Sequence, residues 1–306
     1  MTRIALNRRR KNTLAGLLFA SPWIIGFLCF TLYPIGASFY YSLTNFNVFQ
    51  PPRFVGMANY AQLFSDESFY KGLYNTFYMT IIGTPVYLVF SLIAALLLNS
   101  KLKTIAVYRT IFYLPSVVPL VASSLLWIWI LNPMNGLLNN ILKAVHLYQP
   151  NWLGNPSLTK PSLILIGMWA TGQTMVIFLA ALKDVPRQLH EAARIDGAGA
   201  WARFVHVTLP SISPVILFQV IMSVIYSLQY FTQAYVIAGS QGGLNIAKGG
   251  PENSILFYVM YLFHNAFYYL KMGKASAMAW ILFVIIALVT WLLFRTSRQW
   301  VSYGSE

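Results

Sequence analysis

The segment 183–203, KDVPRQLHEAARIDGAGAWAR, is a charged island between two long stretches that carry no charge. The stretch before it covers 161–182, and the stretch after it begins at 204 and continues to 247. Either stretch is long enough for a membrane-spanning helix of about 20 residues. The rest of the chain repeats this arrangement, so its charges divide it into membrane spans and connecting loops.

The composition agrees with a membrane protein. Hydrophobic residues make up 58% of the chain, charged residues only 9%, and the mean hydropathy is +0.60. Soluble domains carry about 25% charged residues. The predicted fold is an all-α membrane protein with six transmembrane helices and a short cytoplasmic helix between spans four and five. The spans are expected near 14–42, 73–98, 109–131, 162–182, 210–238 and 275–294.

The basic residues set the expected orientation. With six spans both termini lie on one side of the membrane, and that side collects fourteen of the 21 Lys and Arg residues. Basic loops stay in the cytoplasm, so 1–13 and 295–306 are expected to be cytoplasmic ends of a transmembrane domain at 14–294. The loop 184–209 then faces the cytoplasm. This topology accounts for the net charge of +14, and no nucleic-acid partner is expected.

Two further segments bear on the number of spans. The run Arg8 to Lys11 before an apolar stretch is typical of a signal peptide, but the stretch is too long and lacks a clear cleavage site, which favours a retained first span. The segment 254–270 is apolar enough for a seventh span, which would place Arg295 outside the cell. Its aromatic content instead predicts an interfacial or re-entrant helix on the outer face.

The cytoplasmic loop has helix signals of its own. Asp184 is a candidate N-cap, Pro186 suits the first turn, and Gly197 can adopt the left-handed conformation that ends a helix. A folded helix in a short loop indicates a docking element, although an ordinary amphipathic loop helix has the same pattern.

Several function classes lack the residues they need. All seven acidic residues lie outside the expected spans, so there is no candidate proton relay in the membrane. The phosphate-binding pattern GxxxxGK[ST] is absent, as are His or Cys clusters with metal-ligand spacing and any catalytic constellation. We therefore expect no cofactor, no metal and no enzymatic activity in this chain.

The charged loop carries a family signature: Glu191-Ala192-Ala193, then Gly197, then Val207 and Leu209-Pro210. This spacing resembles the "EAA" signature of permease subunits of binding-protein-dependent ABC importers, with Val207 where the family usually has Ile. Further runs resemble carbohydrate permeases of the maltose/glycerol-phosphate type. They include Ser21-Pro22-Trp23, Tyr33-Pro34, Phe54-Val55-Gly56, Asn59-Tyr60, Leu114-Pro115 and Leu131-Asn132-Pro133.

The resemblance implies a pore-forming subunit in the bacterial inner membrane that imports a sugar or oligosaccharide. Its implied partners are a second permease, two copies of a cytoplasmic ATPase that binds ATP and Mg²⁺, an extracytoplasmic solute-binding protein and membrane lipid. The loop helix would be the coupling helix that docks on the ATPase. The residues assigned to coupling are Glu191, Ala192, Ala193, Asp196, Gly197, Leu209 and Pro210.

The candidate solute contacts lie on spans four and five. Ser223, Tyr226, Ser227 and Tyr230 follow the i, i+3, i+4, i+7 rule for one helix face, and the matching face of maltose-type permeases contains substrate contacts. Hydroxyl groups and aromatic faces suit a sugar. Span four adds Trp169, Thr171, Gln173 and Thr174. Packing between membrane helices uses the same residue types and is the alternative.

Three other functions are weighed. A glycerol-phosphate-like or other non-sugar solute is the nearest, but it favours a basic residue that faces the pore, and none is evident inside a span. A stand-alone secondary carrier would work without an ATPase. A membrane-embedded enzyme would require a catalytic constellation. Four prolines, Pro34, Pro85, Pro115 and Pro119, interrupt apolar helices and are either hinges or static kinks.

Overall fold

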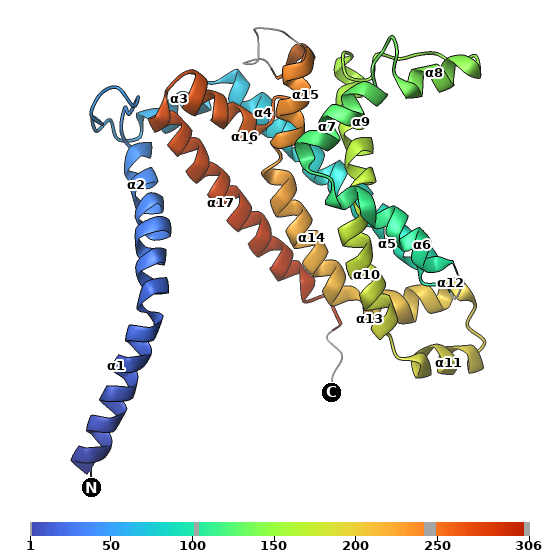
Figure 1. Cartoon of the computed structure of the whole chain (residues 1–306), viewed down its shortest axis with the longest axis horizontal. Coiled ribbons are helices and arrows are strands. Elements are labelled where there is room, and N and C mark those ends of the chain that lie inside the picture. Colours follow the sequence, from blue (N-terminus) through green and yellow to red (C-terminus); the bar gives the residue numbers. More distant parts are fainter. Residues whose placement is uncertain (1, 101–103, 242–248, 303–306) are drawn as a thin grey trace. The chain divides into compact units, whose positions relative to one another are not determined.

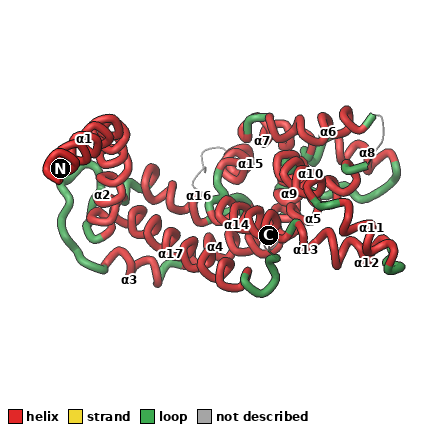
Figure 2. The backbone as a smooth tube through the Cα atoms, turned by 90° about the horizontal axis from the view of Figure 1, so that it is seen from below, coloured by secondary structure: helices red, strands yellow, loops and turns green. Residues whose placement is uncertain are grey.

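The computed structural model describes residues 2–100, 104–241 and 249–302 of the 306-residue chain. These residues are helical almost throughout, and Figure 2 shows no strand among them. The single extended pairing in the described part is an isolated antiparallel bridge between Thr44 and Phe54. Lys101 and Lys103, expected in a cytoplasmic loop, lie outside the described residues, as does the end of the predicted C-terminal segment 295–306.

The described residues form two compact units. The first comprises Met1–Ser65 with Asn265–Ile281, and it holds α1 (Thr2–Phe27), α2 (Tyr33–Ser42), α3 (Ala58–Phe64) and the beginning of α17 (Met272–Ser297). The second comprises Asp66–His264 with Leu282–Glu306, and it holds the remaining helices and the end of α17 (Figure 1). Both the loop 184–209 and the candidate solute contacts belong to this second unit.

Among the described residues, thirteen α-helices lie wholly in the second unit (Figure 1). They are α4 (Glu67–Tyr78), α5 (Thr84–Leu98), α6 (Ile105–Tyr113), α7 (Leu120–Ile130), α8 (Leu137–Ala144), α9 (Pro156–Trp169), α10 (Gly172–Asp184), α11 (Arg187–Ile195), α12 (Ala200–Arg203), α13 (Leu209–Ser211), α14 (Ser213–Leu228) and α15 (Thr232–Gln241), followed by the short α16 (Tyr258–Phe263). α5 packs against α9, α10 and α14, and α7 packs against α15.

Four helical segments are long and apolar enough to cross a membrane: Asn12–Ser42, Glu67–Leu98, Ser213–Ser240 and Met272–Ser297. They coincide with the first, second, fifth and sixth expected spans to within a few residues at most ends. Two bent helix pairs, Ile105–Val117 with Leu120–Ile130 and Pro156–Trp169 with Gly172–Asp184, pass the same test together. The described residues therefore supply four continuous spans, or up to six when each bent pair counts as one.

Three prolines inside helical segments are accommodated without a break. Each follows a π-helical turn by two residues: Leu28–Leu32 precedes Pro34, Met79–Gly83 precedes Pro85, and Phe204–Thr208 precedes Pro210. Proline lacks an N–H group and collides with the carbonyl four residues earlier, and the wider π turn relieves both problems. Pro34 and Pro85 thus leave the first and second spans continuous.

The third expected span is not one helix, which corrects the prediction of a single helix over 109–131. α6 ends in a 3₁₀ turn at Leu114–Val117, and α7 leaves it at an angle of 102°. The break is at Val118, which has extended geometry with ψ 128°. Pro119 follows it, and the residue before a proline is pushed out of the helical region.

The fourth expected span bends by 52° between α9 and α10, at Ala170 and Thr171. No proline lies at this bend. Instead, α10 begins at Gly172, whose backbone lies against the end of α6. A Cβ atom there would be 2.5 Å from the Phe112 carbonyl oxygen and 2.8 Å from the Tyr113 Cα. The bend of span four therefore lies beside a close glycine contact with the end of α6.

The segment 254–270 forms only the short α16 and a π turn, and much of it is buried. Asn75 on α4 donates its amide to the carbonyl oxygens of Asn253 and Leu256, both at 2.9 Å, and the Tyr258 N–H donates to the Thr76 hydroxyl. Ile255 to Tyr258 are buried. The segment therefore packs on α4 along 255–258 and is not an exposed helix there, while the choice between an interfacial and a re-entrant helix stays a prediction.

Candidate functional site

The start of the loop helix α11 differs from the expected capping. Asp184 is the last residue of α10 and does not cap α11, and Pro186 is the N-cap residue, with ψ 130°, not part of the first turn. Val185 between them is extended and buried in an apolar cluster with α5 and α10. This buried valine fixes the point at which the chain leaves α10 and enters the loop.

The end of α11 matches the expected glycine stop. Gly197 has φ +78°, in the left-handed region that glycine adopts without a steric cost. The Ala198 N–H donates to the Ala193 carbonyl at 2.8 Å, and the Gly197 N–H donates to the Arg194 carbonyl at 3.0 Å. These are the two hydrogen bonds of a Schellman motif, so the prediction that Gly197 ends this helix is confirmed.

α11 lies at the edge of the second unit (Figure 1). None of its residues is buried. Glu191 and Ala192 are exposed, and Ala193 is half-buried. Ile195, the last residue of the helix, and Trp201 beyond it are 87% and 76% exposed, so two large apolar side chains are open in one loop. Small alanines beside exposed apolar groups form the kind of surface on which another protein docks.

The loop is anchored to the spans behind α11. The Arg203 guanidinium donates through Nη1 to the Ala198 carbonyl at 2.8 Å, just after the glycine turn. The π turn that follows packs on α11 and carries Val207, which contacts the apolar cluster of α5 and α10. Leu209 and Pro210 are half-buried at the start of α13. A continuous path thus connects α11 to α14.

The chain's C-terminal segment lies at the same end of the second unit as this loop (Figure 1). The Ser302 N–H donates to the Ser213 hydroxyl at 2.9 Å, at the first residue of α14. Ser213 follows directly from α13 and the loop. The end of the last span and the loop 184–209 are therefore on one side of this unit. This agrees with the prediction of two spans, an even number, between the loop and the C-terminal segment.

The four predicted contacts of span five do not share one surface. Tyr226 is 69% exposed and Ser223 is half-buried. Ser227 is buried and accepts a hydrogen bond from the Thr80 hydroxyl at 3.2 Å. Its hydroxyl therefore joins two helices of the same unit, which is the packing role that Ser and Thr often have between membrane helices.

Tyr230 lies beyond the helix that carries the other three. α14 ends at Leu228, and the chain turns before α15 begins at Thr232. The Tyr230 hydroxyl donates to the Gln233 side-chain oxygen at 2.7 Å, and its ring packs against Phe257 with centroids 5.0 Å apart. The helical spacing that grouped Tyr230 with Ser223 therefore does not hold at its last position.

The four predicted contacts of span four surround the bend between α9 and α10. Trp169 is the last residue of α9, and its ring meets Trp127 edge to face at 6.0 Å. The Thr171 hydroxyl donates to the Met168 carbonyl at 2.8 Å. Gln173 is exposed and Thr174 is half-buried on the first turn of α10. The bend thus places polar and aromatic groups on either side of a helix break.

Sequence reasoning missed a set of buried polar atoms in the second unit. The Tyr87 hydroxyl, the Trp127 indole N–H and the Gln219 amide nitrogen are buried without a hydrogen-bond partner among the described residues. Gly167 makes room for the Tyr87 ring, since a Cβ there would lie 2.5 Å from it. No sequence motif identifies these residues, and the contact between Gly167 and Tyr87 is visible only in the structure. Buried polar atoms without partners are rare and costly.

No group of three or more His, Cys, Asp or Glu side chains that could hold a metal ion occurs in the described part of the chain. Cys29 is exposed on the π turn of the first span. The polar groups described above are hydroxyls, amides and indoles, which suit hydrogen bonding to a neutral polar solute better than coordination of a cation.

Three comparisons place this geometry among known proteins. Residues 87–300 match the family described as "Binding-protein-dependent transport system inner membrane component". The "Probable ABC transporter permease protein YesP" of Bacillus subtilis (strain 168) is 43% identical, over 97% of this chain and 94% of that protein. The "Lactose transport system permease protein LacF" of Rhizobium radiobacter is 33% identical, over 95% of this chain and 96% of that protein.

The fold is also that of a solved structure. A chain of a bacterial alginate ABC transporter, crystallised in complex with an alginate-pentasaccharide-bound periplasmic protein, superposes with a TM-score of 0.78. The match covers 99% of this chain and 100% of that chain, at 21% sequence identity. The overall arrangement of the helices is therefore one that is found in an experimental transporter structure.

Proposed function

The chain belongs to the family of binding-protein-dependent transport system inner membrane components, and from this premise we propose that it forms half of the pore of an ATP-driven importer for a sugar or oligosaccharide. The relative named for lactose transport, 33% identical over nearly the whole chain, supports a carbohydrate as the solute. The polar groups of spans four and five, which are hydroxyls, amides and aromatic rings, agree with such a solute.

The proposed topology has six spans in the bacterial inner membrane, with each bent pair counted as one. Residues 1–13 and 295–306 are cytoplasmic, 14–294 form the permease domain, and the loop 184–209 projects into the cytoplasm. The distribution of basic residues supports this orientation. The hydrogen bond between Ser302 and Ser213 also supports it, since it holds the C-terminal segment beside the base of that loop.

The observation that carries the proposal is the surface of α11. None of its residues is buried, its alanines let another backbone approach closely, and Ile195 at its end and Trp201 in the loop add exposed apolar surface. We propose that this helix docks on a cytoplasmic ATPase, with Glu191, Ala192, Ala193, Asp196 and Gly197 at the contact. This chain has no GxxxxGK[ST] pattern, so ATP and Mg²⁺ are bound by the ATPase.

Motion of the ATPase would reach the spans through the loop's anchors. The Gly197 turn and the Arg203 hydrogen bond make α11 continuous with the π turn at Phe204–Thr208. Val207 and the Leu209-Pro210 pair then pass the displacement to α14 and to the cluster of α5 and α10. Two copies of the ATPase, a second permease and an extracytoplasmic solute-binding protein complete the proposed importer.

The candidate solute contacts fall into two groups, those with open surface and those that already make a hydrogen bond within the chain. Ser223 and Tyr226 have open surface on α14, and Gln173 has open surface on α10, so these groups are available to a solute or to the second permease. Ser227 and Tyr230 already make hydrogen bonds within the chain, as does Thr171. Contact between these three hydroxyls and a solute would require that they exchange partners. Trp169 and Thr174 offer an aromatic face and a hydroxyl beside the bend.

The decisive experiment measures ATP hydrolysis by the complex reconstituted in proteoliposomes with its solute-binding protein, over a panel of mono- and oligosaccharides. We expect one sugar class to stimulate hydrolysis, and Glu191→Lys to remove the stimulation. Glu252→Lys is the matched control, because it reverses an exposed acid on the opposite side of the proposed membrane. Hydrolysis indifferent to every sugar would contradict a carbohydrate solute, and a chain that purifies without an ATPase would contradict the importer.

A further inference from the structure

Lys160 is a half-buried cation near the start of α9 that is held by neutral groups. Its ammonium group donates to the Asn75 side-chain oxygen on α4 at 3.0 Å. It also lies over the rings of Tyr74 and Tyr78, 4.7 and 4.8 Å from their centroids. The described residues form no ion pair between Lys160 and an acid. An amide oxygen and two aromatic faces therefore take the place of a carboxylate around this charge.

Asn75 connects Lys160 to a third part of the chain. This buried side chain accepts from Lys160 on α9 and donates its own amide to the carbonyl oxygens of Asn253 and Leu256, both at 2.9 Å. One residue of α4 thus joins α9 to the segment after α15, and all three parts belong to the second unit. We refer to Lys160, Asn75, Tyr74 and Tyr78 as the outer latch.

The bend of span four gives α9 a point about which it can move. Lys160 lies ten residues before Ala170, where the bend of 52° begins, and this separation is about 15 Å along a helix. Beyond the bend, α10 packs on α5, and Gly172 lies in close contact with the end of α6. A small rotation at the bend therefore displaces Lys160 from Asn75 while α10 keeps its neighbours.

The chemistry of the latch makes it reversible. Contacts of an ammonium group with aromatic faces and an amide are strong where water is excluded and weak where water enters. When the helices separate, water hydrates the ammonium group, and no unpaired carboxylate is left behind. A buried ion pair lacks this property, because separating it leaves two charges without partners. The latch can thus hold the helix ends together in one state and release them in another.

We propose that Lys160 is a positioning residue of the outer mouth of the pore. Its contacts hold the outer ends of α4 and α9 and the segment 253–256 together while this mouth is closed, and Lys160 leaves Asn75 when the mouth opens to the solute-binding protein. This inference rests on the proposed function, because the six-span topology places all three parts on the outer side and an importer must open there.

The test measures the distance between the two outer helix ends by pulsed electron paramagnetic resonance. Spin labels replace Glu67 and Ser157, exposed residues in the first turns of α4 and α9, after Cys29→Ser removes the native cysteine. The chain is studied in lipid nanodiscs with the subunits that copurify, without nucleotide and with ATP and orthovanadate. We expect a single short distance without nucleotide and a longer one in the trapped state.

Variants of the latch should change the balance between the two distances. Lys160→Gln should raise the ratio of long to short distances without nucleotide about tenfold, because the contacts with both rings are lost. Tyr74→Leu, which removes one exposed ring, should raise it about threefold. Lys160→Arg should restore the parent ratio, since a guanidinium group also donates and stacks on aromatic rings.

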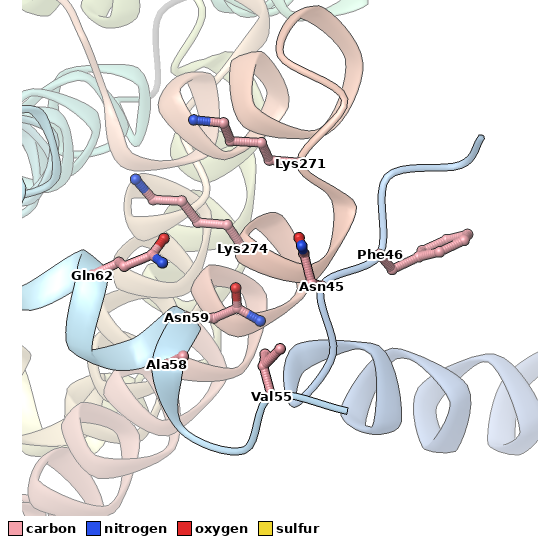
Figure 3. A pocket seen from close by; sticks show the side chains of 8 residues that line it. All are labelled: Asn45, Phe46, Val55, Ala58, Asn59, Gln62, Lys271 and Lys274. Atoms are coloured by element: carbon pink, nitrogen blue, oxygen red, sulfur yellow. The ribbon is translucent and has the colours of Figure 1, made fainter. Parts of the chain in front are cut away.

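Lys271→Gln is the matched control, because it removes the same charge from another outer segment. Lys271 lines a pocket of about 190 Å³ in the first unit, and Figure 3 shows its side chain extending away from Asn45. It precedes α17 and is not part of the latch. Its substitution should leave the distance distribution unchanged.

Four results would overturn the proposal. One distance in both nucleotide states of the parent would show that these helix ends do not separate. Parent-like ratios in Lys160→Gln and Tyr74→Leu would show that the contacts do not hold the closed state. An equal rise in Lys271→Gln would reduce the effect to outer positive charge, and failure of Lys160→Arg would assign it to the packing of the lysine stem.

Failure of the latch and failure of the importer give different observations. Sugar-stimulated ATP hydrolysis together with an unchanging distance refutes the latch alone. A chain that copurifies with no ATPase refutes the importer. If Lys160→Gln does not assemble, the two nucleotide states of the parent and the Tyr74→Leu ratio still decide whether the latch exists.

Discussion

Replacement of Gly197 by alanine tests whether the helix stop of α11 is held by glycine alone. At φ +78° an alanine is strained, because its Cβ approaches the carbonyl oxygen, and the cost is about 1–2 kcal/mol. The chain can avoid this strain by opening the turn, but it then loses two hydrogen bonds worth about 0.5–1.5 kcal/mol each. Both routes cost a similar amount, so we expect a destabilised turn of about 1–2 kcal/mol.

The measurement is amide hydrogen exchange of the peptide that contains Gly197 and Ala198, in the purified chain. A cost of about 1–2 kcal/mol predicts exchange about 5- to 30-fold faster. Gly199→Ala is the matched control, because Gly199 lies in the same loop at φ −66° with open space around its Cα. Its change should stay within about 0.5 kcal/mol. Gly197→Asn should fall between the two, since asparagine tolerates the left-handed region.

The same variants then report on coupling. If the turn transmits the movement of α11, sugar-stimulated ATP hydrolysis in proteoliposomes should fall in Gly197→Ala and remain normal in Gly199→Ala. Equal exchange in the two alanine variants would refute the conformational argument. Faster exchange with unchanged stimulation would keep the local strain but refute the role of a rigid glycine turn in coupling.

Three further changes test the packing of the second unit by the melting temperature of the purified complex. Gly172→Ala should cost about 1–3 kcal/mol, because its Cβ has no room against the backbone of α6, whereas Gly239→Ala, in open space on α15, should be neutral or stabilising. Asn75→Ala should cost about 2–4 kcal/mol, because two buried carbonyls lose their donor, and the exposed Asn140→Ala should change little. Tyr87→Phe should leave stability unchanged or raise it by about 1 kcal/mol, since it removes a buried hydroxyl without a partner among the described residues, and a fall in stability would show that the hydroxyl is bound.

The span positions were predictable because charged residues are costly inside a membrane and their positions can be read from the sequence. Long uncharged stretches locate the continuous spans Asn12–Ser42 and Met272–Ser297 to within a few residues. The helix stop at Gly197 was predictable for a similarly local reason, since one residue type relieves one backbone conformation. Both predictions rest on properties of single residues or short windows, and neither requires knowledge of what packs nearby.

The prolines show where local rules become ambiguous. Pro34 and Pro85 follow π turns and leave their spans continuous, whereas Pro119 terminates a 3₁₀ turn and produces a bend of 102°. In the broken span, Pro115 and Pro119 are one helical turn apart, so two neighbouring hydrogen bonds of the helix lose their donors. Pro34 and Pro85 each follow one wider turn, whereas Pro115 and Pro119 have only a 3₁₀ turn and the extended Val118 between them.

The candidate solute face could be predicted only as far as its helix extends. A 3.6-residue period assigns residues to one side of a helix, and α14 ends at Leu228, so Tyr230 leaves the face that Ser223 and Tyr226 share. Periodicity also cannot identify a hydroxyl that already has a partner, as Ser227 has in Thr80. A buried polar atom that has no hydrogen-bond partner among the described residues can be recognised only from the structure.

Tyr87, Trp127 and Gln219 supply such atoms in the second unit, within a family whose members assemble with other proteins. In a membrane interior an unsatisfied donor costs more than it does near water, because no solvent replaces the missing partner. Tyr87 stands on the second span and Gln219 on the fifth, and those two spans pack together. A solute hydroxyl, water or neighbouring subunit that contacts these atoms would complete their hydrogen bonds. The unsatisfied polar atoms therefore mark candidate contact positions that the helical period did not identify.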